Sequence, residues 1–324
     1  MAPDASLLAR FADDLDTLIP SERRLGVAVS GGPDSLALLL LAAAVRPGRV
    51  DAITIDHALR PESGDEAALV ARICASLGVP HEVRAVEWGE KPASALQERA
   101  RRSRYALIAT WMRERGLQGV CTAHHRDDQA ETTVMRLARG TGVRGLAAMR
   151  PSAPLPGAED LTLLRPLLGW RRSELAAICS GAGIAPAADP SNDDLQFERV
   201  RVRQQIRLSG LDAENLARSA DHLRAADEAI DWAVERQWAA QVRPTKGGLS
   251  YEPAGEPLEI QRRIIVRILG TLTTEGPAEL RGAEVDRLLE SLFRGRTATL
   301  RGVKAEGGAT WHFQPAPPRT LGCG

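Results

Sequence analysis

Short apolar runs and longer periodic apolar segments alternate along the first 125 residues of the chain. The runs "LGVAVS", "VDAITID", "HEVRAVE" and "QGVCTA" predict four strands. Between and after them, the apolar spacing predicts helices over 34–45, 64–77 and about 94–115, and another from Asp127 onward. Because parallel strands need crossover connections, this alternation predicts an α/β fold, a parallel sheet with helices on both faces.

The second half of the chain reads as mostly helical. A Pro/Gly-rich loop, "RPSAPLPGAED", precedes a short helix from Ser173, and a further helix follows "ADPSNDDLQFERVRVR". One long helix with a single apolar stripe is predicted over 212–242, followed by helices near 257–270 and 282–293 and a hairpin-like end. We therefore expect two parts: an α/β domain over 1–210, and a linker helix with a small C-terminal domain over 211–324.

Charge alone does not indicate a partner, since Lys+Arg and Asp+Glu both total 42 in the 324 residues. Arginines nevertheless cluster in "RARRSR" (99–104) and in "RVRVRQQIR" (199–207). Such clusters indicate either a basic face for nucleic acid or an ordinary solvated helix surface.

The longest apolar run, "LALLLLAAAV", is shorter than the about 20 residues that span a bilayer, so no membrane partner is expected. The acidic, amphipathic N-terminus lacks the basic region of a secretory signal. The four cysteines are far apart and form no CxxC. We expect a cytoplasmic protein with reduced thiols.

The glycine-rich turn "SGGPDS" joins the first strand to the first helix of this alternation. Such a turn presents backbone N–H groups and a positive helix end to an anion. It lacks the lysine of GxxxxGK[ST] and does not match GxGxxG. It resembles the PP-loop of the N-type ATP pyrophosphatases, in which ATP is cut between the α and β phosphates. On that resemblance the ATP-binding candidates are Ser30, Gly31, Gly32, Pro33, Asp34 and Ser35, together with His57 after the second strand.

In that turn Asp34 is the candidate to hold Mg²⁺ against the polyphosphate, because hard oxygen ligands suit this ion. The alternative is an ordinary helix start, with Pro33 and Asp34 filling its first turn.

The segment "AHHRDDQAET" follows the fourth strand, so it is expected at the same edge of the sheet as the glycine turn. Its candidate catalytic residues are Asp127, Asp128 and Glu131, which could bind magnesium or an incoming amine. The alternative is a helix N-terminus whose acids only favour the helix dipole. The histidines lack the i, i+4 spacing of a helical zinc pair.

Six strings together resemble the tRNA(Ile)-lysidine synthetases: "SGGPDS", "DHALRPES", "LQERARRSRY", "AHHRDDQAETTVMRLARGTGVRGL", "RPLL" and "DPSNDDLQFERVRVR". The resemblance covers about residues 24–207, and the remainder resembles the short form of that family, without its second C-terminal domain. It implies ATP-dependent adenylation of the wobble cytidine of a tRNA(Ile) with a CAU anticodon. Free L-lysine then displaces AMP, leaving lysidine. The resemblance also implies tRNA phosphate contacts by Arg99, Arg102, Arg201 and Arg203, although "RVRVR" stands where "RNRIR" is expected.

Rival functions differ in what they require. A PP-loop tRNA thiolase would need paired cysteines or an iron–sulfur cluster, and an amidotransferase would need a glutaminase. A tRNA- or nucleotide-binding module without catalysis would have no need of Asp34 and the acids that follow the fourth strand.

Overall fold

The computed structural model describes the chain except for residues 1–2, 58–62, 89–95, 187–193, 274–281 and 317–324. The chain divides into two compact units, Met1–Arg224 (unit 1) and Ala225–Gly324 (unit 2). This division lies within the long helix α9 (Ala213–Gln241), close to the helix expected over 212–242. The functional boundary expected between residues 210 and 211 stays a prediction.

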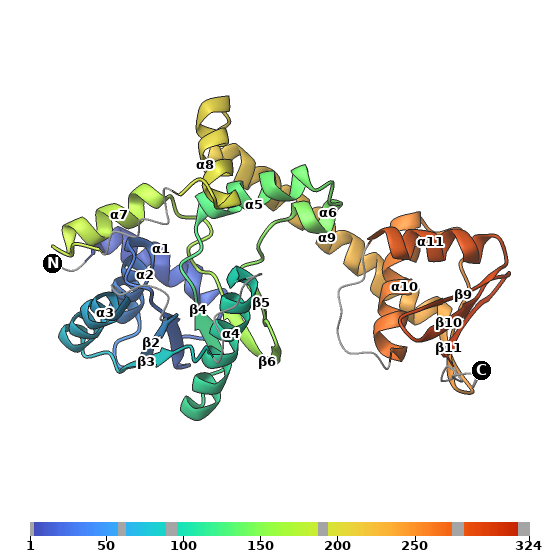
Figure 1. Cartoon of the computed structure of the whole chain (residues 1–324), viewed down its shortest axis with the longest axis horizontal. Helices are drawn as coiled ribbons and strands as arrows, with labels where there is room; N and C mark the ends of the chain where they lie inside the picture. The colour runs from blue at the N-terminus through green and yellow to red at the C-terminus, as the bar shows by residue number, and fades with distance from the viewer. Residues whose placement is uncertain (1–2, 58–62, 89–95, 187–193, 274–281, 317–324) are drawn as a thin grey trace. The chain divides into compact units, whose positions relative to one another are not determined.

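Unit 1 is built on a six-stranded sheet with the order β3-β2-β1-β4-β6-β5 (Figure 1). The strands are β1 (Leu25–Ala28), β2 (Val50–Asp56), β3 (His81–Ala85), β4 (Gly119–Cys121), β5 (Ser152–Leu155) and β6 (Ala158–Leu164). All neighbouring pairs are parallel except β5 and β6. The α/β prediction is therefore confirmed.

The Pro/Gly-rich segment that the sequence assigns to a loop is instead the hairpin β5–β6, and that expectation is wrong. Gly157 adopts a positive φ of 78° between the two strands, which suits a tight reversal. Pro154 is tolerated because β5 is an edge strand, where a missing N–H costs no ladder hydrogen bond.

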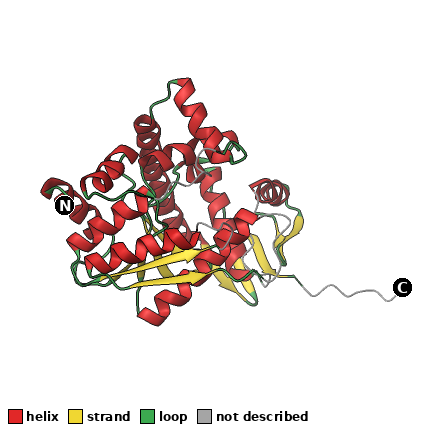
Figure 2. Cartoon of the chain, turned by 60° about the vertical axis from the view of Figure 1, so that its left-hand side comes forward, coloured by secondary structure: helices red, strands yellow, loops and turns green. Residues whose placement is uncertain are grey.

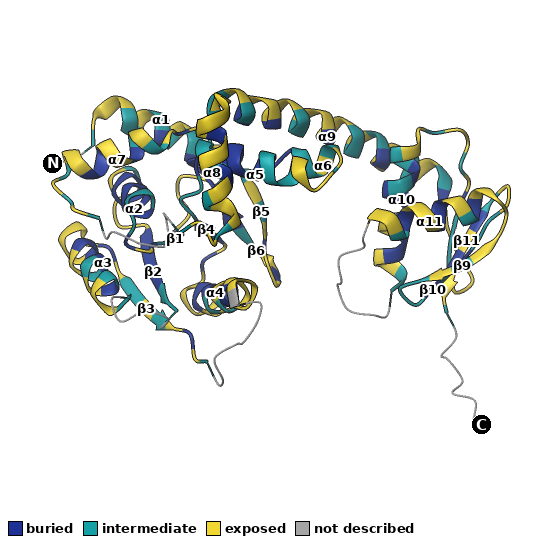
Figure 3. Cartoon of the chain, turned by 45° about the horizontal axis from the view of Figure 1, so that its top comes forward, coloured by how far each residue is buried: buried dark blue, intermediate teal, exposed yellow. Residues whose placement is uncertain are grey.

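Helices cover both faces of this sheet (Figure 2). The helices of unit 1 that precede α9 are α1 (Ala5–Asp16), α2 (Pro33–Val45), α3 (Ser63–Leu77), α4 (Leu96–Arg115), α5 (Arg126–Ala138), α6 (Val143–Leu146), α7 (Arg172–Gly181) and α8 (Glu198–Ser209). Helix α2 is apolar on all sides and is buried from Ser35 to Ala42, as the dark colour in Figure 3 shows. It lies in the main core cluster, which includes side chains from α1, α3 and α7. The first residues of α2 are therefore held on a rigid element.

A second core cluster lies under α4 and contains its Trp111 and Met112. Gly26 of β1 makes this packing possible, because a Cβ there would lie 2.7 Å from Cζ3 of Trp111. The smaller contact between α5 and α8 buries Ala130, Val202 and Ile206. It brings the arginine-rich segment 199–207 beside the acids of α5.

Unit 2 combines helices with a five-stranded antiparallel sheet of order β7-β8-β11-β10-β9. Its elements after α9 are β7 (Val242–Thr245), β8 (Gly248–Tyr251), α10 (Leu258–Leu272), α11 (Gly282–Phe293), β9 (Thr297–Leu300), β10 (Val303–Glu306) and β11 (Trp311–Pro315). The sequence predicts the helices and the hairpin-like end but not β7 and β8, whose segments, "VRPT" and "GLSY", contain no apolar run. The rings of Tyr251 and Trp311 meet edge to face in the core, with centroids 5.7 Å apart.

Within the described parts of the chain, no helix is both long and apolar enough to cross a membrane. Cys74, Cys121 and Cys179 are free and buried, while Cys323 lies outside the described residues. Burial raises the pKa of their thiols, to about 11 for Cys74 and Cys179 and about 12 for Cys121.

Candidate active site

Strands β1 and β4 are neighbours in the sheet, although two strands separate them in sequence. The chain runs outward from β1 to β2 and β3, and then returns to the other side of β1 with β4. Ligands of open α/β sheets bind at such a reversal, outside the carboxyl ends of the strands. The glycine turn follows β1 and the "AHHRDD" segment follows β4, so the structure brings these two predicted clusters together.

The glycine turn has the geometry of an anion cradle. Gly31 has a φ of 86°, a conformation that only glycine adopts without strain. Helix α2 begins at Pro33 with Gly32 as its N-cap, and within the described part of the chain it has no side-chain cap hydrogen bond. The hydroxyl of Ser35 donates to the carbonyl of Gly32 at 3.0 Å and accepts from the N–H of Ser30 at 3.1 Å. The serines thus hold the turn, and the helix N-terminus stays free for a ligand.

A cavity of about 380 Å³ opens beside this turn. One wall is apolar and includes Ile53, Ile55 and Ile108, while Asp34 and His57 are among its polar lining residues. An apolar wall next to an anion cradle fits a nucleotide, whose base is flat and apolar and whose phosphates are charged.

His57, a predicted ATP-binding residue, lines this cavity, and beside it lies a cation that sequence reasoning did not single out. The Nε of Arg104 donates to Nε2 of His57 at 3.4 Å, and Trp88 donates to the carbonyl of His57. Burial, together with the charge of Arg104, lowers the pKa of His57. His57 is therefore a neutral acceptor at pH 7. Arg60, which follows His57 after the same strand, lies outside the described residues.

The centre of the site is His125, which the sequence analysis did not select. It is 3% exposed and is surrounded by three of the predicted carboxylates. Its Nε2 lies 3.4 Å from Asp34 and 3.6 Å from Asp128, and its Nδ1 lies 3.5 Å from Asp127. The backbone N–H of His125 also donates to Asp128 at 3.1 Å. Thus His125 is the N-cap of α5, and it joins the glycine turn to the acids of that helix.

Burial alone would lower the pKa of His125, but the carboxylates of Asp127, Asp34 and Asp128 outweigh it and raise the pKa to about 10. The same contact with His125, together with the N–H of Arg172, lowers the pKa of Asp127 to about 2. His125 is consequently a cation at neutral pH. The adjacent His124, whose pKa burial lowers to about 4, is neutral.

Glu131 lies one helical turn beyond Asp127 and is 2% exposed. Arg203 donates to its Oε1 at 2.6 Å, and Arg199 approaches both its Oε2, at 3.9 Å, and Asp128, at 3.4 Å. Burial raises the pKa of Glu131, although Arg203 opposes this shift. Arg203, predicted to contact phosphates, is thus in an ion pair with an acid of the site.

The other predicted arginines lie farther from these contacts. Arg102 is exposed and pairs with Glu98 on the same helix at 3.1 Å, and Arg99 is also exposed. Arg201 donates to two backbone carbonyls in the segment before α8. The four predicted arginines therefore differ in the groups they contact, and a single sequence does not display those contacts.

One carboxylate of the site, that of Asp34, is suited to binding magnesium. Among the described residues, no group of three or more His, Cys, Asp or Glu side chains forms a metal cage. However, Oδ1 of Asp34 is buried without a hydrogen-bond partner. Mg²⁺ is usually held by one or two carboxylates plus substrate phosphates, and Asp34 at the glycine turn can supply such a carboxylate.

These features define a PP-loop protein, and comparison with known proteins agrees. A family model for the PP-loop domain, ATP_bind_3, matches residues 5–208. The tRNA(Ile)-lysidine synthase of Novosphingobium aromaticivorans is 46% identical over 95% of this chain and 94% of its own. That of Zymomonas mobilis is 43% identical over 93% and 91%. The chain therefore belongs to the tRNA(Ile)-lysidine synthase family.

One solved structure shares the fold at much lower identity. The U34-tRNA thiolase NcsA from Methanococcus maripaludis, with its [4Fe-4S] cluster, gives a TM-score of 0.55 at 14% identity. The match covers 68% of this chain and 80% of that one. At this identity the likeness supports the fold alone.

Proposed function

We propose that the chain is a cytoplasmic ligase that joins L-lysine to C2 of the wobble cytidine of a tRNA(Ile) with a CAU anticodon. ATP is converted to AMP and pyrophosphate in two steps, through an adenylated cytidine. The observation that carries the proposal is the meeting of the glycine turn with Asp34, Asp127 and Asp128 around His125, in a chain of this family.

In the first step the O2 atom of cytidine attacks the α-phosphate of ATP. A bond forms between O2 and that phosphorus, and pyrophosphate leaves. The free N-terminus of α2 receives phosphate oxygens, and the apolar wall of the cavity receives the adenine. Magnesium, when bound, would neutralise phosphate charge, and Asp34 is the residue that would hold it.

In the second step the ε-amine of lysine attacks C2 and AMP departs with O2. Adenylation makes O2 a good leaving group, but the ammonium must first lose a proton. We assign the binding of the ammonium to Asp128, on the rim of the site. Glu131 accepts the proton, because a carboxyl with a raised pKa is a better base near pH 7. Asp127 orients His125 between these acids and the nucleotide turn.

A thiolase is the rival with related chemistry. Its sulfur transfer would use a reactive thiol, whereas the three described cysteines are buried and have raised pKa values. A binding module without catalysis would have no need of three partly exposed carboxylates around a cationic histidine.

The test is mass analysis of nucleosides from a tRNA(Ile) transcript with a CAU anticodon, incubated with the protein, ATP and lysine. The expected product is cytidine that has gained lysine with loss of water, and it should disappear when ATP or lysine is omitted. The matched control is the initiator tRNA(Met), which carries the same anticodon and should stay unmodified. A sulfur-containing nucleoside, or no modified nucleoside at all, would reject the ligase.

A further inference from the structure

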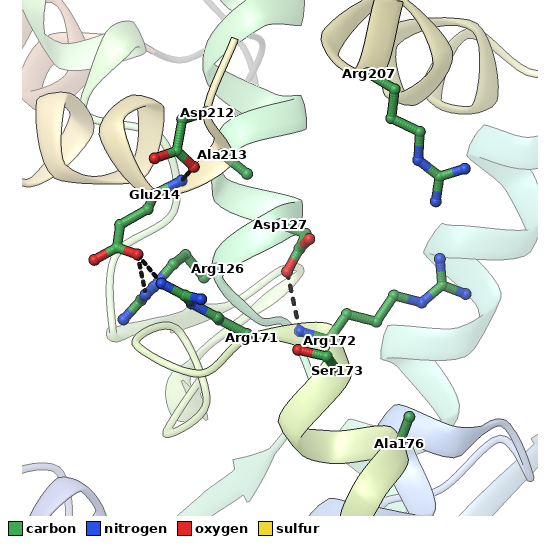
Figure 4. A pocket seen from close by; sticks show the side chains of 10 residues that line it. All are labelled: Arg126, Asp127, Arg171, Arg172, Ser173, Ala176, Arg207, Asp212, Ala213 and Glu214. Atoms are coloured by element: carbon green, nitrogen blue, oxygen red, sulfur yellow. Dashed lines mark hydrogen bonds and ion pairs between the residues drawn. The ribbon is translucent and has the colours of Figure 1, made fainter. Parts of the chain in front are cut away.

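A second cavity, of about 660 Å³, lies in unit 1 on the other side of Asp127 from the nucleotide turn. It is formed by residues distant in sequence, from the N-termini of α5, α7 and α9 and from α8. Four arginines line it, Arg126, Arg171, Arg172 and Arg207, and Figure 4 shows how they are arranged.

The four arginines form two different pairs. Arg126 and Arg171 both turn toward Glu214, and both form ion pairs with it. The guanidinium groups of Arg172 and Arg207 instead point toward one another (Figure 4). Neither guanidinium group has a hydrogen bond or ion pair with any residue that the structure describes. Two like charges that face one another without a carboxylate between them are destabilising unless an anion joins them.

This cavity is connected to the reacting centre through one carboxylate. Oδ2 of Asp127 accepts a hydrogen bond from the backbone N–H of Arg172 at 3.0 Å and lies 3.5 Å from His125. The nucleotide cavity is on the Asp34 side of His125, and the arginine cavity is on the Asp127 side. If a cytidine base is held beside His125, the RNA strand that carries it would therefore lie near the arginine cavity.

We propose that Arg172 and Arg207 bind phosphodiester groups of the RNA strand beside the reacting nucleotide, an inference that rests on the proposed function. Guanidinium groups bind phosphate with paired N–H donors. Such contacts set the register of an RNA strand without reading its sequence.

The charge balance favours phosphodiesters over a polyphosphate. The lining contains four arginines and three acids, Asp127, Asp212 and Glu214, which gives 4 − 3 = +1. A cavity of this charge accommodates groups that carry one negative charge each. It is poorly suited to ATP or pyrophosphate, which would place several charges beside Asp127.

The test measures binding of a synthetic stem–loop RNA with a CAU anticodon, between about 50 and 200 mM salt. The double variant Arg172→Ala/Arg207→Ala should weaken binding at least about 10-fold at the low-salt end. The slope of log K against log[salt] should become shallower by about 1.4, since each phosphate contact on a single strand contributes about 0.7. Arg172→Lys/Arg207→Lys keeps both charges and should recover most of the slope.

The matched control is Arg72→Ala/Arg113→Ala, which removes two exposed arginines of α3 and α4 outside the cavity. It should leave the slope unchanged, and ATP affinity should be the same in all variants. The inference is overturned if both double alanine variants change the slope equally, or if neither does. It is also overturned if only ATP or pyrophosphate binding falls, or if the wild-type protein binds no RNA.

Lysidine formation by the wild-type protein separates this inference from the proposed function. RNA binding that depends on Arg172 and Arg207 in a protein that forms no lysidine supports the site and rejects the ligation. Lysidine formation together with an unchanged salt slope in the double alanine variant rejects the site and leaves the ligation intact.

Discussion

Each unit of the protein contains a buried cation surrounded by three acids. In unit 1 the cation is His125 and the acids are Asp34, Asp127 and Asp128. In unit 2 the cation is Arg263 and the acids are Asp227, Asp231 and Glu259. Arg263 reaches its three partners at 2.7 to 2.8 Å, whereas His125 lies 3.4 to 3.6 Å from its own.

The shorter contacts around Arg263 are those of a structural cluster, whereas the longer contacts around His125 suit a binding site. Arg263 of α10 holds α9 by contacts at hydrogen-bond length with Asp227 and Asp231. Around His125 the contacts are longer than good hydrogen bonds, and the carboxylates border two cavities. Oδ1 of Asp34 has no hydrogen-bond partner among the residues that the structure describes. Unit 1 therefore keeps charge available for a ligand, and unit 2 uses its charge for packing.

The largest expected effect separates chemistry from folding. Asp34→Ala should reduce adenylation by on the order of 10⁴-fold, about 5 kcal/mol, because the proposed mechanism assigns this carboxylate to the metal–phosphate charge. Binding of tRNA should be retained. Pyrophosphate release with tRNA and ATP measures the first, and a titration with labelled tRNA the second. Asp160→Ala, which removes an acid paired with Arg113 at the surface, is the control. Adenylation at the wild-type rate in Asp34→Ala would contradict the assignment.

In contrast to Asp34→Ala, Arg263→Ala should lower the stability of unit 2 and leave nucleotide binding unchanged. Removing one partner of a buried ion network leaves uncompensated charge and costs about 3–5 kcal/mol. Asp227, which is 0% exposed, would then be buried beside the acids that share its arginine. Chemical denaturation followed by the tryptophan signal of unit 2 measures this loss. Arg267→Ala is the matched control, because Arg267 forms a half-exposed pair with Glu235 worth at most about 1 kcal/mol. Equal losses in the two variants would remove the distinction between them.

His125 and its three carboxylates should make the stability of unit 1 depend on pH. The pKa of His125 is about 10 in the folded protein, against an ordinary value of 6.5. Because the folded pKa is raised, the stabilisation is complete below about pH 6.5 and is lost as the pH rises through 10. We expect a loss of about 2–4 kcal/mol over that window, absent in His125→Gln.

The free energy of unfolding, measured between these pH values for both proteins, tests this expectation. Exposed His312→Gln should keep the wild-type profile. The same contact lowers the pKa of Asp127 to about 2, so its stabilisation is also lost in acid, as the pH falls from 3.8 through 2. Identical alkaline limbs in the wild type and His125→Gln would show that the cluster does not hold unit 1 together.

The sequence predicts the parts of this site that depend on local backbone chemistry. Gly31 and Pro33 mark the strand, turn and helix start directly, and the β1–β4 reversal then brings the two motifs together. The pairing of side chains is a different matter. Arg203 is chemically able to bind phosphate or an acid, and only the packing of α8 against α5 selects Glu131.

His125 illustrates the same limit more sharply. Of two adjacent histidines, His124 is neutral and His125 is charged, because only the second lies among three carboxylates. Among the strands that the sequence did not reveal are β5, β7 and β8. Their segments, "SAPL", "VRPT" and "GLSY", lack the apolar run that marks β1, and their pairing partners define them.

Asp128→Asn tests whether the carboxylates around His125 also bind lysine. If Asp128 receives the lysine ammonium, losing one charge-assisted hydrogen bond should cost about 1.5–3 kcal/mol. This corresponds to a lysine requirement raised about 10- to 150-fold, with adenylation largely retained. A lysine titration of lysidine formation measures it, with Glu198→Gln, an exposed acid of α8, as control. Failure of adenylation at every lysine concentration would reassign Asp128 to magnesium binding. Unchanged lysine dependence would mean that Asp128 only stabilises the N-terminus of α5 through the helix dipole.

The smallest effect belongs to an ion pair outside both clusters. Arg102 and Glu98 are 78% and 71% exposed, so water screens their contact on α4. Arg102→Ala should therefore change the free energy of unfolding by no more than about 0.5 kcal/mol. If Arg102 also contacts a tRNA phosphate, as the family resemblance implies, the salt slope of tRNA binding should fall by about 0.7. Glu98→Ala is the matched control, because it breaks the same pair while keeping the arginine. A slope that stays at the wild-type value in Arg102→Ala would leave this arginine with the solvated role of an ordinary surface charge.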